Sequence, residues 1–568
     1  MVKRRSLLIL AAVSLANLLL LWFFHDRYFY PTDDGFYAHI AERLLGGEVF
    51  VRDVQDIHPG YIHLVNVLAF RGFGIDFVSL RYPLVLVGLI QSCVVFLLLE
   101  KRGHAVATSG SLAATALGIP QFVDPNPNWY CLCLCFVLAG WLYWRPEERP
   151  SRLVGAGVLG GLLTLFRHLT GVWVAMAIFA LALLEHSRRD RATGRDTWLA
   201  RALVLTMLSG LVWYLVYSPE TEPGGLLLMA AWPVGILLWL LVHVQAGNRS
   251  VLSIIGRVAL GAGAAATPLA LYLAVHGALT LWFQDIVLAA LAELDLPFYG
   301  QGWYAVLPLA GVYQAVTSFD AVKLANGLYW TALPTLSAVN GAVVLTRMQR
   351  RESPHELILP VLASFFALTA LLFEGPLYLY YTAGLSLVSV LWLITDRSAV
   401  RLVAGAVAAS AIAIIAVVFH AGQSRERTPV EILQGRRVSS WGSETATLDR
   451  AHLRLSARDR DEYAGLVHTI QAQSTADESI FALPYDAELY FLAQRRNPFR
   501  FYSSAQGIKT REELDLVLSE LRRQPPRLVI FSPTDKYNSD RSRAVMDQVR
   551  STYVHIGTEY GREFYRAP

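Results

Sequence analysis

Charged residues are scarce in this chain of 568 residues: they make up 17% of it, while 54% of the residues are hydrophobic. Such a composition excludes an ordinary soluble protein and predicts a membrane protein. The formal net charge is only +4, and the basic residues are spread over several loops instead of forming one stripe. We therefore do not expect nucleic acid as a partner.

Cysteine is also rare. The polar loops and the polar C-terminal part contain none, because all four cysteines fall within apolar runs: Cys93, Cys131, Cys133 and Cys135. The sequence thus predicts neither a disulfide framework nor a cysteine-ligated zinc site. We expect these thiols to pack as small apolar groups.

A leader cleavage site is missing as well. The first apolar run, Ser6–Phe24, follows three basic residues and is long enough to cross about 30 Å of hydrocarbon. No small-x-small motif comes after it, whereas Trp22 and Tyr28 are typical of a membrane interface. We interpret this run as a retained first membrane helix.

Twelve further apolar runs follow, which gives about thirteen spans by the length criterion. They are residues 78–99, 105–119, 129–144, 153–166, 171–184, 199–217, 226–244, 252–275, 326–345, 356–373, 382–394 and 400–420. The intervening loops alternate between basic ones, on the side of the basic N-terminus, and acidic, aromatic ones on the other side. The positive-inside rule then predicts a cytoplasmic N-terminus and, for an odd count, a non-cytoplasmic C-terminus.

The composition turns polar after His420. We expect a polytopic α-helical membrane domain over residues 1–420, with a first external loop at 25–77, and a small soluble α/β domain over 421–568. In the second domain the pattern predicts alternating strands and helices. The strands are expected at 479–483, 499–502, 527–531 and 553–557, and the helices at 487–495, 511–523 and 541–552.

The first external loop has the densest cluster of ionisable groups near any span. Asp33 and Asp34 stand at the start of an amphipathic helix predicted over Tyr37–Leu45, where the helix dipole favours negative charge. One of the two carboxylates is expected to cap the helix. The presence of both beside a membrane span favours a catalytic or substrate-binding role.

Three more polar residues follow in the same loop, Asp53, Asp56 and His58. Such a group can hold a hydroxyl, a phosphate or a metal ion. Their irregular spacing defines no coordination geometry. We predict a role in substrate binding and leave the metal open.

This loop resembles that of GT-C fold glycosyltransferases, in particular the bacterial protein mannosyltransferase, aminoarabinose transferase and arabinofuranosyltransferase branches. The resemblance lies in one N-terminal span followed by Asp33-Asp34-Gly35-x-Tyr37, by an Ala-x-x-Leu-x-x-Gly-Glu segment, and by His58-Pro59-Gly60. Many members have Lys-Pro-Pro where this chain has His-Pro-Gly, which puts a phosphate-binding role of His58 in question.

The resemblance implies an inverting enzyme of the bacterial inner (plasma) membrane that works on the non-cytoplasmic face. Its donor would be a polyprenyl-phosphate sugar and its acceptor a hydroxyl of a glycan, lipid or protein. Asp33 or Asp34 would be the base that deprotonates the acceptor. Some members use a divalent cation and others do not, so the resemblance implies no certain cofactor.

A donor with a phosphate at headgroup level calls for cations and aromatic rings near the membrane interface. The candidate cations are Arg81 at the start of the second span, and Arg167 and His168 in a tight external turn between two short runs. Tyr380 and Tyr381 are candidate substrate contacts at an aromatic mouth. The stretch 281–304 is a candidate interfacial lid, in which Trp282, Trp303 and Tyr304 could stack on sugar.

Two other functions compete with glycosyl transfer. A transporter or flippase for a lipid-linked substrate is disfavoured because the sequence lacks a convincing internal duplication and has few charges in mid-span. A binding or assembly protein, whose tail recruits partners, stays open. Tyr485, Asp486 and Glu488 in the tail could contact an acceptor, although packing and helix capping are the simpler expectation.

Overall fold

The computed structural model describes residues 4–147, 149–192, 194–217, 222–288, 303–372, 376–395, 398–421 and 448–568. The predicted boundary at residue 420 lies next to residues 422–447, which fall outside this described part. Most of the predicted lid, residues 289–302, falls outside it as well.

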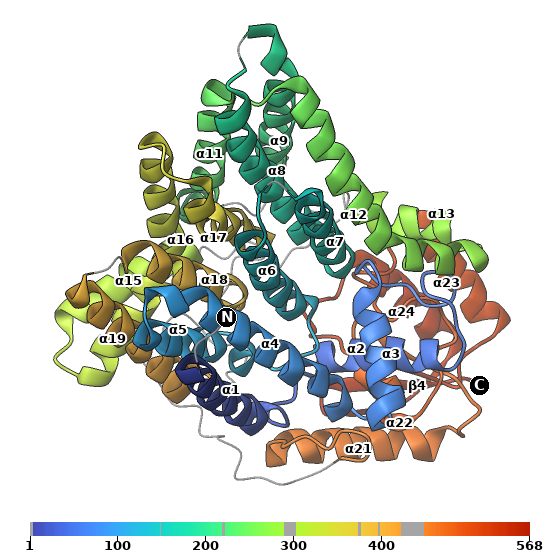
Figure 1. Ribbon diagram of the computed structural model, residues 1–568. Coiled ribbons are helices and arrows are strands. Elements are labelled where there is room, and N and C mark those ends of the chain that lie inside the picture. The colour runs from blue at the N-terminus through green and yellow to red at the C-terminus, as the bar shows by residue number, and fades with distance from the viewer. Residues whose placement is uncertain are drawn as a thin grey trace.

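Helices make up the membrane domain (Figure 1). They are α1 (Arg4–Phe24), α2 (Pro31–Leu45), α3 (Tyr61–Phe73), α4 (Tyr82–Leu99), α5 (His104–Ala116), α6 (Pro127–Trp144), α7 (Pro150–Phe166), α8 (His168–Asp190), α9 (Trp198–Tyr217), α10 (Pro223–Gly225), α11 (Ala231–His243), α12 (Asn248–Val275), α13 (Leu279–Trp282), α15 (Trp303–Thr317), α16 (Ala321–Gln349), α17 (Pro354–Phe366), α18 (Pro376–Ile394) and α19 (Ala399–Ile415).

Each of the thirteen predicted apolar runs coincides with a helical segment. Within the described residues, ten helical segments are long and apolar enough to cross a membrane. Helices α5, α6 and α7 do not meet both conditions, so the exact number of spans is not fixed. The polytopic α-helical class of the domain is confirmed.

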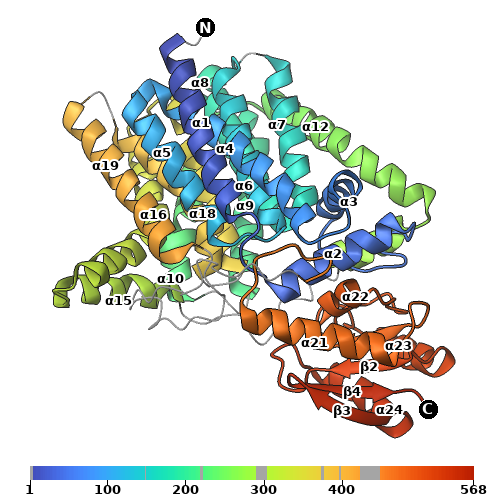
Figure 2. The same ribbon diagram turned by 90° about the horizontal axis from the view of Figure 1, so that it is seen from below.

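The loops separate into two sets at opposite ends of the bundle. At the end that carries the N-terminus, the basic loops contact one another: Arg189 pairs with Glu147 at 2.9 Å, and Asp190 accepts a hydrogen bond from the Gly247 amide at 2.8 Å. The first loop and the C-terminal domain lie at the other end (Figure 2). This grouping agrees with the alternation of loop charge in the sequence.

The C-terminal domain is built on a four-stranded mixed sheet with the order β1-β2-β4-β3. Strands β1 and β2 are parallel, and the other two pairs are antiparallel. Its elements are α21 (Ala457–Gln473), β1 (Ile480–Leu483), α22 (Ala487–Ala493), α23 (Arg511–Arg523), β2 (Leu528–Phe531), α24 (Asp540–Thr552), β3 (Val554–Glu559) and β4 (Arg562–Arg566). The predicted small α/β class is confirmed.

One predicted strand, residues 499–502, is wrong. The side chains of Phe499 and Phe501 are buried as a strand pattern requires. However, the backbone carbonyls there pair with the first loop: Phe499 O accepts from Arg43 at 2.8 Å, and Arg500 O accepts from the Gln55 amide at 3.0 Å. A burial pattern does not reveal where backbone hydrogen bonds go. The sequence prediction also missed β4 and α21.

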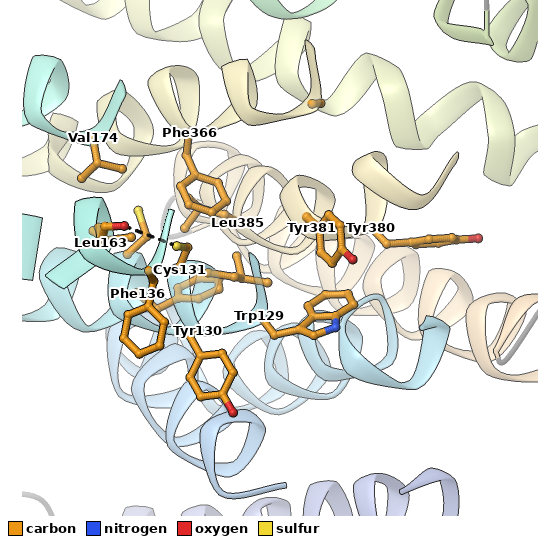
Figure 3. Packing of buried hydrophobic residues seen from close by; sticks show 14 of the residues in the cluster. Trp129, Tyr130, Cys131, Phe136, Leu163, Val174, Phe366, Tyr380, Tyr381 and Leu385 are labelled. Carbon is orange, nitrogen blue, oxygen red and sulfur yellow. Dashed lines mark hydrogen bonds between the residues drawn. The ribbon is translucent and has the colours of Figure 1, made fainter. Parts of the chain in front are cut away.

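The cysteines pack as predicted, and all four are free thiols. Figure 3 shows Cys131 among Phe136, Leu163 and Val174 in the core of the bundle. A disulfide framework is absent from the part of the chain that is described.

Candidate functional site

Helix α2 begins at Pro31, six residues before the predicted helix, so Asp33 and Asp34 belong to its first turn. Proline is favoured at the first helical position because its missing amide proton would be unpaired there. The Asp34 carboxylate Oδ2 accepts a hydrogen bond from the Tyr30 amide, at 2.9 Å, just before the helix. Asp34 therefore stabilises the helix start, as the capping interpretation predicts for one of the two aspartates.

Asp34 also forms a fully buried ion pair with Arg81, with 2.6 Å between Oδ2 and Nη2. The other terminal nitrogen of Arg81 donates to the carbonyls of Arg27 at 2.7 Å and His25 at 3.4 Å. Burial raises the pKa of the Asp34 carboxyl to about 6, and the ion pair offsets only part of this rise. Arg81 thus connects the end of α1 to the start of α2.

Asp33 is 6% exposed and lies at the junction of the first loop and the C-terminal domain. Burial raises the pKa of the phenols of Tyr37, from α2, and of Tyr485, which precedes α22. The negative charge of Asp33 adds to the rise of both pKa values. Of the two aspartates, Asp34 has one carboxylate oxygen bonded to Arg81 and to the Tyr30 amide. Asp33 is the aspartate whose charge affects tyrosines from both domains.

A third carboxylate joins this group. Asp124, in the segment before α6, is fully buried. Its charge acts on Tyr30, Tyr37 and Tyr130. The sequence analysis did not single it out. The available signal was its position in an acidic loop on the same side of the membrane as the first loop.

Asp56 accepts hydrogen bonds from two imidazoles. Its Oδ2 lies 2.7 Å from Nδ1 of His58 and 2.7 Å from Nε2 of His63. Its Oδ1 accepts from the hydroxyl of Tyr502, in the C-terminal domain, at 2.9 Å. Burial alone would raise the pKa of the Asp56 carboxyl, but the two imidazoles outweigh it and the pKa is lowered. His63 and Tyr502 were not singled out by the sequence analysis.

Asp53 lies apart from this cluster. Its carboxylate accepts from the Val49 amide at 2.7 Å and pairs with the exposed side chain of Arg52 at 2.7 Å. Both partners are close in sequence, so these bonds stabilise the turn after α2. Their contribution to stability is small, since exposed pairs are worth about 0–1 kcal/mol.

Arg167 lies between α7 and α8 and is 8% exposed. Its guanidinium donates to the Tyr378 hydroxyl at 3.0 Å and lies 5.4 Å from the centre of that ring. The charges of Arg167, His58 and Lys509 all act on the ring of His168. Three segments that are far apart in sequence, which carry Arg167, His58 and Lys509, thus lie close to His168.

The two predicted tyrosines of α18 point differently (Figure 3). Tyr381 is fully buried and lies edge-on to Trp129, with 4.5 Å between ring centres. Tyr380 points away from Trp129 and lies 6.0 Å from the Trp330 ring.

Of the aromatic residues in the predicted lid, Trp282 donates a hydrogen bond to the Pro59 carbonyl at 2.7 Å.

The C-terminal domain packs directly on the start of α2. A Cβ atom on Gly35 would lie 2.5 Å from the backbone nitrogen of Glu488, at the start of α22. Only glycine therefore fits at this position of the Asp-Asp-Gly motif. Arg450 strengthens the junction through an ion pair with Glu42 of α2 at 2.6 Å. The first loop and the C-terminal domain together form one candidate site.

No family model matches the sequence, and no curated protein matches it either. Among solved structures, the chain is similar to ArnT from Cupriavidus metallidurans bound to undecaprenyl phosphate. The identity is 13%, the alignment covers 99% of this chain and 98% of that one, and the TM-score is 0.39. The same protein in the apo state gives 14% identity, coverage of 98% and 97%, and a TM-score of 0.38.

The chain is also similar to the oligosaccharyltransferase of Archaeoglobus fulgidus, in a complex with Zn and sulfate. The identity is 12%, the alignment covers 92% of this chain and 68% of that one, and the TM-score is 0.47.

Proposed function

We propose that this chain is an inverting glycosyltransferase of the GT-C type. It transfers a sugar from a polyprenyl-phosphate donor to a hydroxyl of a glycan, lipid or protein acceptor. The observation that carries the proposal is the position of Asp33, a buried carboxylate in the first turn of a helix between a polytopic membrane domain and a soluble domain. A lipid-borne donor and a water-borne acceptor meet at such a boundary.

Asp33 is the proposed base. The acceptor oxygen attacks the anomeric carbon of the donor sugar and forms the new glycosidic bond, while the bond from that carbon to the phosphate oxygen breaks. The acceptor proton moves to the Asp33 carboxylate, and the electron pair of the broken bond leaves with the polyprenyl phosphate. Attack from the side opposite the phosphate inverts the anomeric centre.

Asp34 and Arg81 are proposed as positioning residues. The Asp34 carboxylate is bonded to the guanidinium of Arg81 and to the Tyr30 amide. This pair keeps the first turn of α2, and with it Asp33, in place beside the end of α1. Their removal is expected to act on the reaction through the position of Asp33.

The leaving phosphate is proposed to bind near Arg167, His168 and His58. A guanidinium presents two parallel N–H groups that match phosphate oxygens, and a charge-assisted bond of this kind contributes about 1.5–3 kcal/mol. The proximity of Arg167, His58 and Lys509 to the ring of His168 supports this location. Tyr380 stays a proposed contact of the lipid or sugar, on the same helix as Tyr378.

We also propose the orientation of the chain in a bacterial plasma membrane. The loops at the N-terminal end of the bundle carry the basic residues, as the positive-inside rule requires of the cytoplasmic face. The first loop and the C-terminal domain would then lie on the periplasmic or extracellular side. Lipid-phosphate sugars that have crossed the membrane are available there.

Transfer by the purified protein in detergent tests the proposal, with radiolabelled polyprenyl-phosphate sugars as donors. Arg167→Gln should raise KM for the donor about 10- to 100-fold, in line with the loss of one charge-assisted bond. The matched control is Arg71→Gln, because Arg71 is an exposed arginine on α3, and its KM should be unchanged. A transporter would show no transfer in detergent but would move the donor lipid across sealed vesicles, and that result would replace the proposal.

A further inference from the structure

Asp56, His58 and His63 bring three potential metal ligands together. The Asp56 carboxylate oxygen, His58 Nδ1 and His63 Nε2 all lie within 4.8 Å of one another. The side chains of Asp56 and His63 are 0% and 1% exposed, and that of His58 is 12% exposed. Two turns of the chain create this arrangement: His58 follows Asp56 by two residues, and His63 lies in the first turn of α3.

The kind of donor atom indicates the kind of ion. Mg²⁺ and Ca²⁺ are bound mainly by oxygen ligands, whereas two imidazole nitrogens with one carboxylate oxygen suit Zn²⁺ and its neighbours among the transition metals. We propose that Asp56, His58 and His63 bind one divalent ion of the zinc type. This site is separate from the base assigned to Asp33 but shares His58 with the proposed phosphate subsite, and its test needs no enzymatic activity.

The adjustment that such an ion requires is small. Zinc bonds to nitrogen and oxygen are about 2.0–2.1 Å long, so tetrahedral ligands stand about 3.3 Å apart. Each imidazole nitrogen now lies 2.7 Å from the Asp56 oxygen. A retreat of about 0.6 Å by each ring would bring its distance from the Asp56 oxygen to that value. The two imidazole protons would leave the coordinating nitrogens, so binding releases or relocates protons.

The C-terminal domain supplies the outer contact of this site. Tyr502 donates its hydroxyl to the second carboxylate oxygen of Asp56 at 2.9 Å, and such contacts fix the orientation of a ligating group. Tyr502 also stacks on Phe36 of α2, with 5.5 Å between ring centres. A bound ion would therefore tie the first loop and α3 to the C-terminal domain, and would stabilise the junction at which Asp33 lies.

Metal binding is measured directly on the full chain, purified without a polyhistidine tag and treated with EDTA. Co²⁺ is titrated first, because its visible absorption reports nitrogen and oxygen coordination, and Zn²⁺ is then added to displace it. We expect one equivalent of Co²⁺, displaced by one equivalent of Zn²⁺, and a rise in Tm with Zn²⁺ concentration, since an ion that binds only the folded state stabilises it.

Three variants locate the site. His63→Gln removes a ligand and should abolish the Co²⁺ absorption. Tyr502→Phe keeps the ligands and the aromatic ring, and should weaken binding about 10- to 100-fold, as the loss of an outer contact does. The control, His39→Gln, removes a histidine of α2 that is also buried but stacks on Tyr490, and should bind as the original chain does. No stoichiometric binding to the original chain, or equal binding by His63→Gln, would overturn the proposal.

Discussion

Two buried arginine–carboxylate pairs occupy opposite ends of the helical bundle. At the end that carries the N-terminus, Arg152 makes a two-pronged pair with Glu185, at 2.6 and 2.8 Å, and its third donor group bonds the Leu142 carbonyl at 3.0 Å. At the other end, Arg81 meets Asp34 through a single nitrogen at 2.6 Å. In the described residues, Asp34 Oδ1 and Arg81 Nε have no hydrogen-bond partner.

The difference between the two pairs shows at which end of the bundle polar atoms of the buried pair are left without a hydrogen bond. Buried polar groups are almost always paired, and an unpaired one costs about 1–3 kcal/mol. The Arg152 pair is complete and has the features of a structural element. The Arg81 pair is incomplete and adjoins Asp33, the proposed base. The unpaired polar atoms of this pair therefore lie beside the proposed base.

The largest expected effect distinguishes the role of Asp33 from that of Asp34, which belongs to the incomplete pair. Asp33→Asn should lower kcat about 10²- to 10⁴-fold, the range for loss of a general base, with little change in Tm. Asp34→Asn should lower Tm, because it leaves the buried charge of Arg81 unpaired, at a cost of about 3–5 kcal/mol. Transfer rates and thermal unfolding of both variants provide the measurement. Equal losses of kcat at unchanged Tm would contradict the division of roles.

Loss of the complete pair, Arg152 with Glu185, should lower stability without changing the rate of transfer. Glu185→Gln should destabilise the protein by about 3–5 kcal/mol, because Arg152 keeps a buried charge without its carboxylate partner. The double variant Arg152→Met with Glu185→Leu should recover most of this loss. Unfolding midpoints in detergent test both expectations, and the rate of transfer per folded molecule should stay unchanged. A fall in that rate would show that this pair also serves the reaction.

The smallest expected effect, per pH unit, is a pH dependence of the stability of the domain junction. Burial, with the neighbouring charge of Asp486, raises the pKa of Glu488 far above its usual 4.5, although Arg562 opposes this rise. The folded state therefore binds a proton that the unfolded chain loses. The stabilisation is complete below about pH 4.5 and decreases as the pH rises through the raised pKa, by at most about 1.4 kcal/mol per pH unit.

Thermal unfolding of the full chain between pH 5 and 9 measures this dependence. The Tm of the original chain minus that of Glu488→Gln should fall as the pH rises, because the variant carries no charge at this position at any pH. Glu512→Gln, a change at an exposed glutamate of α23, is the matched control. A difference in Tm between the two chains that rises with pH over this range would contradict the sign.

Sequence patterns located the elements well where burial and backbone pairing agree. The apolar runs became helices because a helix pairs its backbone internally, whatever its neighbours are. The strand predicted at residues 499–502 failed because its partner is the first loop, more than 400 residues away in the chain. The first-loop helix begins six residues before its predicted start, because Pro31 occupies the first helical position, where proline favours a helix start.

The candidate site shows the same limit. Asp33, Asp34, Asp56 and His58 could be named in advance because they share one short loop. His63, Asp124 and Tyr502 could not, since nothing local distinguishes them from ordinary polar residues of a helix, a loop and a buried segment. Arg81 and Asp34 were each named, but their pairing was not foreseen.

The sequence by itself determined that this is a polytopic membrane protein with a small α/β domain after its helices, and that its ionisable groups concentrate in the first loop. Hydropathy and loop charge act through the solvent, so each residue contributes independently of its distant neighbours. Only the tertiary structure decided which aspartate is paired with Arg81, which residues surround Asp56, and that the C-terminal domain adjoins the candidate site. Those contacts join segments that are far apart in the chain. The burial and the partners of a side chain therefore depend on several segments at once, and no single segment of the sequence determines them.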